Sequence, residues 1–498
     1  MTGSFRIAFV TGALAFGASA AHGQSWRLRL DAAAQRVEFR GITADSIAEG
    51  STRIGSSGGL ESPDGFAVEC IGDGYCRFFR PGALAAGIPA SVGATLTLWG
   101  LGIPGLSIHA NVRAITDLTG DRIWPGTSPT LRVIEGYAEY IHEGITAQLG
   151  RTIEFGRLAS VGTSGLDGAR VSWRPAVTGF EFGAYAGWGT ARGTILPVTS
   201  PAVDPLADYQ PSSRQIVIGL LAATHLPGLD VQTEYRRELD PLTHYIVAER
   251  GAASLHATPV RRVGIAAGID YDIAQAQLGS ADASVTYTNT AVSGTLAARH
   301  YRPFFDLWTV WGVFSPVPFN GVSAAIAITP MPKVQLRSRV EWYRYDNADV
   351  NAAGLSWKDQ GWRWAVDGTI APADQWTVDV GTHGEVQPGA SSAGADIRLT
   401  WRPTSVVDFA LSGGNLARPL ELRFQDAGVT YVGIAAGYRT GERWRLDVAV
   451  DRYWEARDRP DAASIDWNQW RLSARASLTL RSSADRWLPP ARPLASGP

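Results

Sequence analysis

Apolar and polar residues alternate along nearly the whole chain, and this period of two limits the possible folds more than any other feature. It is visible in "WRLRLD" from Trp26, "KVQLRSRVEWY" from Lys333, "WTVDVGTHGEV" from Trp376 and "WRLSARASLTL" from Trp470. Successive side chains of a strand point to opposite faces, so each segment predicts a strand with one apolar and one polar face. Helical periodicity is hard to find, and no run of about 18 uncharged apolar residues follows the N-terminus, which excludes a bundle of membrane-spanning helices.

The segment "ERWRLDVAVDRYW" at 442–454 raises the question of which face meets water. Its alternate positions are apolar at Trp444, Leu446, Val448 and Val450, and polar or small at Arg445, Asp447, Ala449 and Asp451. A soluble sandwich would bury the apolar face, whereas an outer-membrane barrel turns it to lipid and points the charges into a wet lumen. Trp444 and Trp454 are ten positions apart, which matches the 9–11 residues that a tilted strand needs to cross the apolar band. The spacing favours the barrel.

The connections between the alternating segments take turns in length. Short ones lie near residues 103, 142, 175, 226, 258, 288, 329, 372, 402 and 440, and long ones include 117–130, 190–212, 240–248, 302–318, 347–360 and 455–466. This sorting is typical of a meander barrel with short periplasmic turns and longer external loops. We therefore predict an all-β fold, a transmembrane antiparallel barrel of about 22 strands (20–24), with both termini periplasmic.

The alternation slips in the first expected strand, near residues 26–41. Trp26, Leu28 and Leu30 are even, whereas Val37 and Phe39 are odd. Either a bulge near 32–34 or a strand that continues beyond the bilayer would explain this change of face.

Tryptophans recur at the ends of the expected strands, where aromatic girdles form at the membrane interfaces. The candidates are Trp362, Trp376, Trp401, Trp444, Trp454 and Trp470. Trp362, Trp364, Trp376, Trp401 and Trp470 are assigned to a periplasmic belt beside short turns.

A segment outside the barrel is predicted at each end of the chain. Residues 1–23 have Arg6, an apolar stretch and small residues before Gly23, which predicts a signal peptide; the apolar stretch is short for a membrane anchor. The mature chain would then form a barrel over 24–480, followed by a Pro-rich periplasmic tail at 481–498.

In an oxidising compartment Cys70 and Cys76 predict a disulfide within a long first loop, 42–91. Two thiols without a nearby histidine argue against a metal site.

The expected lumen face carries charges of both signs. The candidates are Arg337, Arg339, Glu341, Asp379, His383, Glu385, Arg445, Asp447, Asp451, Arg471 and Arg475, together with Asp230, Glu234 and Arg236. They could form a field that selects solutes, or ion pairs that hold neighbouring strands in register. Both interpretations stay open at this point.

Two loops are unusual. The stretch 301–321 is rich in aromatic residues, with loop candidates Phe304, Phe305, Asp306, Trp308, Trp311 and Phe314. It could fold into the lumen as a constriction, offer rings for stacking on sugars or a protein, or extend two strands and pack on itself. The stretch 69–83 predicts a disulfide-closed hairpin that stiffens an external loop, or part of a plug made from 42–91.

The pattern over nearly the whole mature chain resembles the Gram-negative outer-membrane porin superfamily. It departs from that superfamily at the end, where the last strand finishes at Leu480 and a Pro-rich tail follows instead of a terminal aromatic residue. The Cys-containing stretch and the aromatic loop also look like those of large barrels that resemble the barrel component of porin-cytochrome conduits. No Cys-x-x-Cys-His occurs, so any haem in such a conduit would belong to a partner.

Other functional classes find little support. The net charge of -2 without a basic block argues against nucleic-acid binding. His109, His142 and His383 have no Ser or Asp partner at a recognisable spacing, so we expect no enzyme and no cofactor. A plugged, TonB-gated receptor would need well over a hundred residues before the barrel, and about fifty are available in 42–91.

The predicted function is a water-filled pore for small polar solutes in the bacterial outer membrane, in contact with its lipid. The alternative is a sheath that encloses a periplasmic electron-transfer partner such as a multihaem cytochrome. A homo-oligomer is compatible with either prediction.

Overall fold

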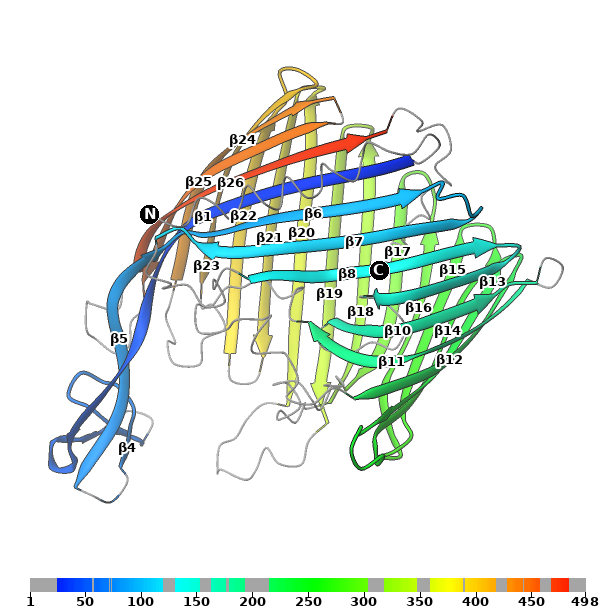
Figure 1. Cartoon of the computed structure of the whole chain (residues 1–498). Helices are drawn as coiled ribbons and strands as arrows, with labels where there is room; N and C mark the ends of the chain where they lie inside the picture. Colours follow the sequence, from blue (N-terminus) through cyan, green and yellow to red (C-terminus); the bar gives the residue numbers. More distant parts are fainter. Residues whose placement is uncertain are drawn as a thin grey trace, which may run out of the picture.

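The computed structural model of the chain describes most of the predicted barrel (Figure 1). The described residues are 25–55, 58–70, 72, 74–119, 130–152, 163–175, 179–192, 215–302, 318–346, 359–387, 390–417, 428–441, 443–456 and 467–482. The expected signal peptide, the six loop candidates from Phe304 to Phe314 and the tail beyond residue 482 lie outside them. No helix among the described residues is long and apolar enough to cross a membrane.

Twenty-two antiparallel strands form a closed barrel, as predicted. They are β1 (Ser25–Ala48), β6 (Pro89–Trp99), β7 (Leu106–Asp117), β8 (Thr130–His142), β9 (Ile145–Thr152), β10 (Thr163–Trp173), β11 (Phe180–Arg192), β12 (Ile216–Leu226), β13 (Leu229–Leu239), β14 (Ile246–Val260), β15 (Val263–Asp272), β16 (Gln277–Thr288), β17 (Val292–Tyr301), β18 (Phe319–Met331), β19 (Val334–Tyr345), β20 (Gln360–Ala373), β21 (Trp376–Gln387), β22 (Ala390–Trp401), β23 (Val407–Ala417), β24 (Gly428–Thr440), β25 (Trp444–Ala456) and β26 (Trp467–Arg481).

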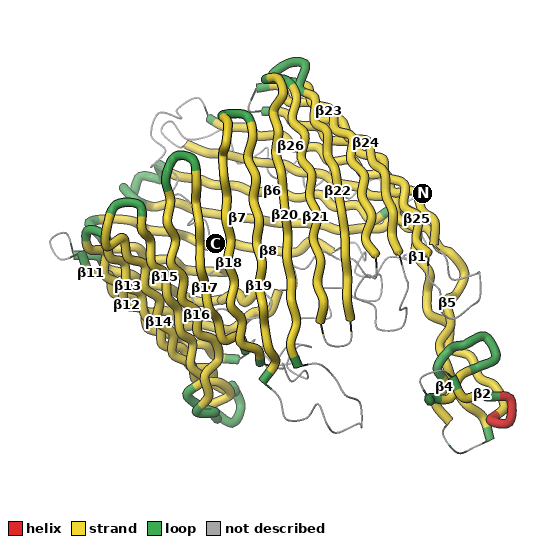
Figure 2. Tube along the Cα trace, turned by 180° about the vertical axis from the view of Figure 1, so that it is seen from behind, coloured by secondary structure: helices red, strands yellow, loops and turns green. Residues whose placement is uncertain are grey.

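The barrel closes through β1, which pairs with β26 on one side and with β6 on the other. In Figures 1 and 2 the strands of the near wall run crosswise to those of the far wall. This is the view expected when every strand tilts by about 40° in the same sense around the barrel axis.

The two faces of the wall match the alternation of the sequence. In β25 the side chains of Trp444, Leu446, Val448 and Val450 are exposed on the outside. Asp447 and Asp451 lie on the opposite face and are partly buried. The apolar side chains therefore face out and the charged ones face in.

The connections also follow the predicted sorting. Each of the ten short connections joins two neighbouring strands at one end of the barrel, which we call the short-turn end, although 176–178 and 442 lie outside the described residues. Ser25 and residue 482 lie at the same end. The opposite end, the long-loop end, is less uniform than expected, because 273–276 joins β15 to β16 and 388–389 joins β21 to β22.

The first strand continues beyond the barrel wall. Its register with β26 is unbroken from Arg27 to Arg36, so the bulge considered near 32–34 is absent. Residues 37–48 pair instead with β5 (Tyr75–Gly87), with a register shift between Arg40 and Ile42. The two strands form an arm that projects from the barrel at the long-loop end (Figure 1). The segment 42–91 is therefore largely strand and not a long loop.

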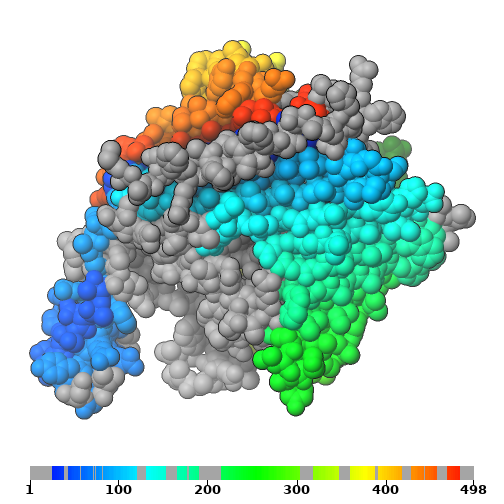
Figure 3. Space-filling view, viewed as in Figure 1, coloured from blue at the N-terminus to red at the C-terminus, as the bar shows by residue number. Residues whose placement is uncertain are grey.

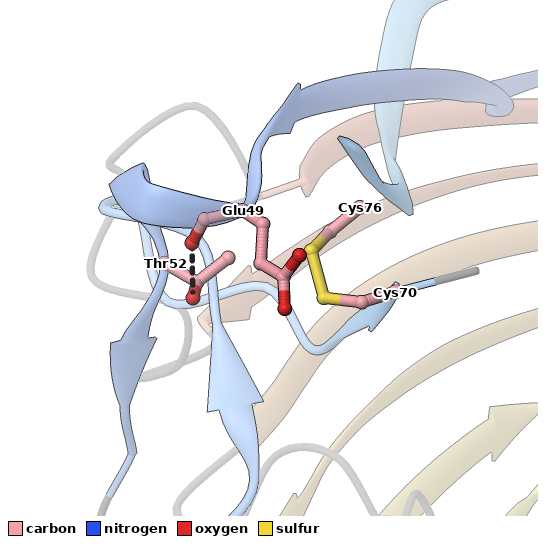
Figure 4. The surroundings of a disulfide bond; sticks show 4 residues. All are labelled: Glu49, Thr52, Cys70 and Cys76. Atoms are coloured by element: carbon pink, nitrogen blue, oxygen red, sulfur yellow. Dashed lines mark hydrogen bonds between the residues drawn. A yellow bond between two sulfur atoms is a disulfide. The ribbon is translucent and has the colours of Figure 1, made fainter. Parts of the chain in front are cut away.

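The tip of the arm is a small closed unit. It contains the 3-10 turn η1 (Glu49–Ser51), β2 (Arg53–Ile54), β3 (Leu60–Glu61) and β4 (Val68–Cys70). Cys70 and Cys76 form the predicted disulfide, and Thr52 Oγ1 donates a hydrogen bond to the carbonyl of Glu49 beside it (Figure 4). Cys76 and Phe78 are buried in this unit.

The described part of 42–91 does not plug the lumen, contrary to one of our two predictions. Figures 2 and 3 show the arm as a lobe that stands away from the barrel body. At its base the Asp117 carboxylate accepts a hydrogen bond from the Ile88 N–H, and the Leu118 N–H donates to the Ile88 carbonyl. These contacts attach the arm to the end of β7.

Replacing both cysteines by serine should loosen the tip without affecting the barrel. The disulfide closes a short loop, so its loss should lower the local stability of the tip by roughly 2 kcal/mol. Limited proteolysis would then cleave within 49–75 faster in the Cys70→Ser/Cys76→Ser protein than in the oxidised wild type. The heat-modifiable mobility of the folded barrel on gels serves as the control. Equal cleavage rates would contradict a stabilising role.

Candidate functional site

All eleven candidate charges from the sequence lie on the inner face of the wall. Arg337, Arg339 and Glu341 alternate with Leu336 and Val340, which are exposed on the outside. The same alternation places the remaining candidates inside on three strands: Asp379, His383 and Glu385 on β21, Arg445, Asp447 and Asp451 on β25, and Arg471 and Arg475 on β26. The alternation of the sequence was therefore enough to predict that these side chains lie on the inner face. Whether they pair with one another or stay accessible depends on the contacts between strands.

Glu341 is the centre of the largest charged cluster near the long-loop end. Only 1% of it is exposed, and Arg299 on β17 holds its Oε1 through Nη2 at 2.6 Å. Its Oε2 lies 3.3 Å from Arg339 Nη2 and 3.5 Å from Arg363 Nε on β20. One buried carboxylate thus holds guanidinium groups from three strands together.

Aromatic rings border this cluster on the side of the long-loop end. The Arg363 guanidinium lies 4.6 Å from the ring centre of Tyr343, and the Arg299 guanidinium lies 4.9 Å from that of Phe319. The Tyr343 hydroxyl donates a 2.7 Å hydrogen bond to Glu385 Oε1. Cation–π contacts and a shared carboxylate fix the planes of these guanidinium groups.

Glycines make room for the buried side chains. A Cβ at position 361 would lie 2.5 Å from the Tyr343 ring, and one at position 321 would lie 2.9 Å from Glu341 Oε1. The cluster therefore depends on Gly321 and Gly361 as well as on its charged members.

The other inner-face candidates form smaller contacts. Arg445 pairs with Asp447 at 2.7 Å, Asp379 accepts a 2.7 Å hydrogen bond from Thr369, and Arg471 lies 4.4 Å from the ring centre of Tyr453. Arg337 donates to Gln335 and remains exposed. The Thr369–Asp379 and Arg471–Tyr453 contacts join neighbouring strands, whereas the Arg445–Asp447 pair lies within β25 and does not hold two strands in register.

A second cluster of buried charges lies on the inner face of β13–β15. Arg236 pairs with Glu238 at 2.5 Å, and Arg250 pairs with Asp270. Tyr185 Oη donates to Glu234 beside an apolar group of Leu166, Val217 and Leu221. Glu234 and Arg236 are among the residues predicted from the sequence, whereas Glu238, Arg250 and Asp270 are not, although the alternation continues from β13 into the two following strands. Side chains fill this part of the wall's inner surface.

His109 does not form a catalytic relay with its two polar neighbours. Contrary to the sequence analysis, His109 has a serine partner, because Ser107 Oγ lies 2.9 Å from its Nε2. Glu139 approaches the same nitrogen at 3.8 Å. A relay needs the acid and the hydroxyl on different ring nitrogens. Among the described residues no group of three or more His, Cys, Asp or Glu side chains could hold a metal ion.

The tryptophan girdle is present at both ends, with one correction. Trp376, Trp401 and Trp444 border short turns, and Trp376 stacks on Trp401 with ring centres 5.6 Å apart. Trp362 and Trp470 were assigned to the same end, as was Trp364. They lie instead at the long-loop end with Trp454, because β20 and β26 begin after long connections.

A closed wall, an apolar outer face bounded by tryptophans and a charged inner face together decide what kind of protein this is. The chain is an outer-membrane β-barrel.

Solved structures of outer-membrane proteins are similar to this barrel. The siderophore receptor PirA from Pseudomonas aeruginosa has a TM-score of 0.51 at 11% identity, covering 91% of this chain and 80% of that chain. The copper transporter OprC has a TM-score of 0.47 at 11% identity (93% and 81% covered), and the outer membrane protein opdK from Pseudomonas aeruginosa has 0.41 at 9% identity (92% and 99% covered). No protein-family model matches the sequence. No curated protein matches it significantly.

Replacing Glu341 by glutamine should destabilise the barrel and change its inner charge. The substitution leaves three guanidinium groups around a neutral side chain. These groups are 33–58% exposed and water can hydrate them, so the expected loss is on the order of 1 kcal/mol. Urea unfolding of the refolded barrel in lipid vesicles would measure this loss. Arg337→Gln on the same strand is the matched control, because Arg337 is exposed and donates a hydrogen bond to the neutral Gln335. Equal midpoints for both variants would contradict the central role of Glu341.

Proposed function

We propose that this barrel is a passive channel for small polar solutes. The observation that supports the proposal best is the exposure of charged side chains on the inner face. The Arg339 side chain is 58% exposed although it points into the barrel. Lipid covers the outside, so water in the lumen must hydrate such a group. A continuous water-filled lumen is the physical requirement for diffusion of polar solutes.

The size of the barrel supports the same proposal. Barrels of 16–18 strands already leave an aqueous channel, and the diameter grows with the number of strands. This wall has 22 strands. Part of its inner surface is occupied by the packed side chains of β13–β15, whereas the wall of β17–β21 presents exposed charged groups.

The charges near the long-loop end favour anions slightly. Arg299, Arg339 and Arg363 surround Glu341, and Glu385 is the second carboxylate in contact with this group. The local balance is one positive charge, which would raise the local concentration of anionic solutes by a modest factor at physiological ionic strength.

The alternative function, a sheath around a periplasmic cytochrome, has no specific contact or surface in its favour among the described residues. It stays a hypothesis, as does a homo-oligomer. A barrel that never conducts although it is folded would favour the sheath.

Neighbouring alanines on β17 allow a direct test of the lumen. Ala297 lies opposite Ser323 on the inner face, and Ala298 lies opposite the outward-facing Val322. In a planar bilayer we expect single-channel conductance from the wild type. We expect a membrane-impermeant charged thiol reagent to change it by tens of per cent in Ala297→Cys and to have no effect in Ala298→Cys. The native cysteines are joined in a disulfide and do not react.

Two results would overturn the channel. A folded barrel without conductance would exclude free diffusion through the lumen. Equal reactivity of the two cysteines would mean that the inner face is no more hydrated than the outer face.

A further inference from the structure

Arg452 is a charged residue on the outer, lipid-facing side of the wall. It lies directly opposite Trp470 on β26 and Val432 on β24, and both of these side chains are exposed on the outside. Directly opposite residues of neighbouring antiparallel strands share a face. The Arg452 side chain therefore projects toward the membrane and not into the lumen.

Its height along the strand places Arg452 at a membrane interface. Trp454 follows two residues later on the same face, close to the long-loop end of β25, and Trp444 marks the other end of the strand. Tryptophans occupy the level of the lipid headgroups. The guanidinium group is thus held at the headgroup level of the external leaflet.

Other outward-facing arginines near this end have a carboxylate partner within the chain. The pairs are Arg36–Glu38 at 2.8 Å, Arg151–Asp167 at 2.6 Å, Arg237–Glu249 at 2.6 Å and Arg344–Asp359 at 2.6 Å. Arg452 contacts no carboxylate among the described residues. Its contacts there are two aromatic rings, Trp454 at 5.6 Å and Trp470 at 5.2 Å from ring centre to guanidinium carbon.

Two tryptophan rings orient a guanidinium group but do not neutralise it. At the headgroup level a cation costs little, and the anions it meets there are the lipid phosphates. Cation–π contacts leave the in-plane N–H groups free, and these N–H groups match the spacing of phosphate oxygens in a bidentate contact. Exposed apolar side chains, Val450 and Leu472, continue the same face toward the membrane centre, where acyl chains would lie.

From this geometry we infer that Arg452, Trp454 and Trp470 form a binding site for the phosphate of a lipid headgroup in the external leaflet. The arginine binds the phosphate, the two rings hold the arginine in place, and the apolar face below contacts the acyl chains. The site lies on the opposite face of the wall from the lumen, so it is independent of the proposed channel.

Native mass spectrometry of the folded barrel in detergent can test this site, with lipid A and chemically dephosphorylated lipid A as probes. A charge-assisted hydrogen-bonded contact contributes about 1.5–3 kcal/mol, so we expect lipid A to bind at least about tenfold more weakly to Arg452→Gln than to the wild type. Arg237→Gln, which removes an outward arginine that has its own carboxylate, is the matched control and should bind like the wild type. The dephosphorylated lipid should bind the wild type as weakly as lipid A binds Arg452→Gln.

Several outcomes would overturn the inference. These are equal binding of both lipids to the wild type, wild-type affinity in Arg452→Gln, an equal loss in Arg237→Gln, or displacement of the lipid by millimolar inorganic phosphate. If Arg452→Gln does not fold, Trp470→Leu, which keeps the arginine but removes one ring, should still weaken lipid A binding relative to the wild type. The comparison of the two lipids needs no variant at all.

Discussion

Satisfaction of the backbone hydrogen bonds in the membrane is the constraint on which this structure depends. Hydrocarbon offers no partner to a free strand edge, so a sheet can cross a membrane only if its first and last strands meet. Here β1 supplies that closure, with ten residues in register with β26 and ten with β6. Once the sheet is closed, each residue faces either lipid or lumen. The alternation in the sequence, the tryptophans at the strand ends and the charges on the inside all follow from that choice.

Much of this architecture was predictable, because a period of two fixes the face of every residue without knowledge of its neighbours. The end at which Trp470 lies depends on the parity of the preceding connections. The long connection at 455–466 places the start of β26, and Trp470 with it, at the long-loop end, because strand starts alternate between the two ends. The Glu341 cluster was harder to predict. Arg299 lies 42 positions from Glu341, and their contact depends on the stagger of β17 to β19, which alternation does not encode.

The prediction that 42–91 forms a long loop was wrong for a physical reason. Within the wall, lipid on one side and water on the other impose alternation on the sequence. Beyond the wall both faces of β1 and β5 meet water or the small tip unit, so nothing there requires apolar and polar residues to alternate. The sequence of residues 42–91 therefore predicts a loop, although most of the segment forms strands, chiefly the end of β1 paired with β5. The change of parity between Leu30 and Val37 marks the place where the strand leaves the membrane.

The continuity of β1 has a mechanical consequence. The same strand forms one side of the arm and, further along, the seam that closes the barrel. A force applied to the disulfide-bonded tip would pass along β1 to its hydrogen bonds with β26 and β6. A pull along the strand loads these bonds in parallel, and bonds loaded together resist far more than bonds opened one after another. A force on the arm would therefore meet the seam of the barrel first, while Asp117 fixes the junction of β5 and β6 at Ile88 to the end of β7.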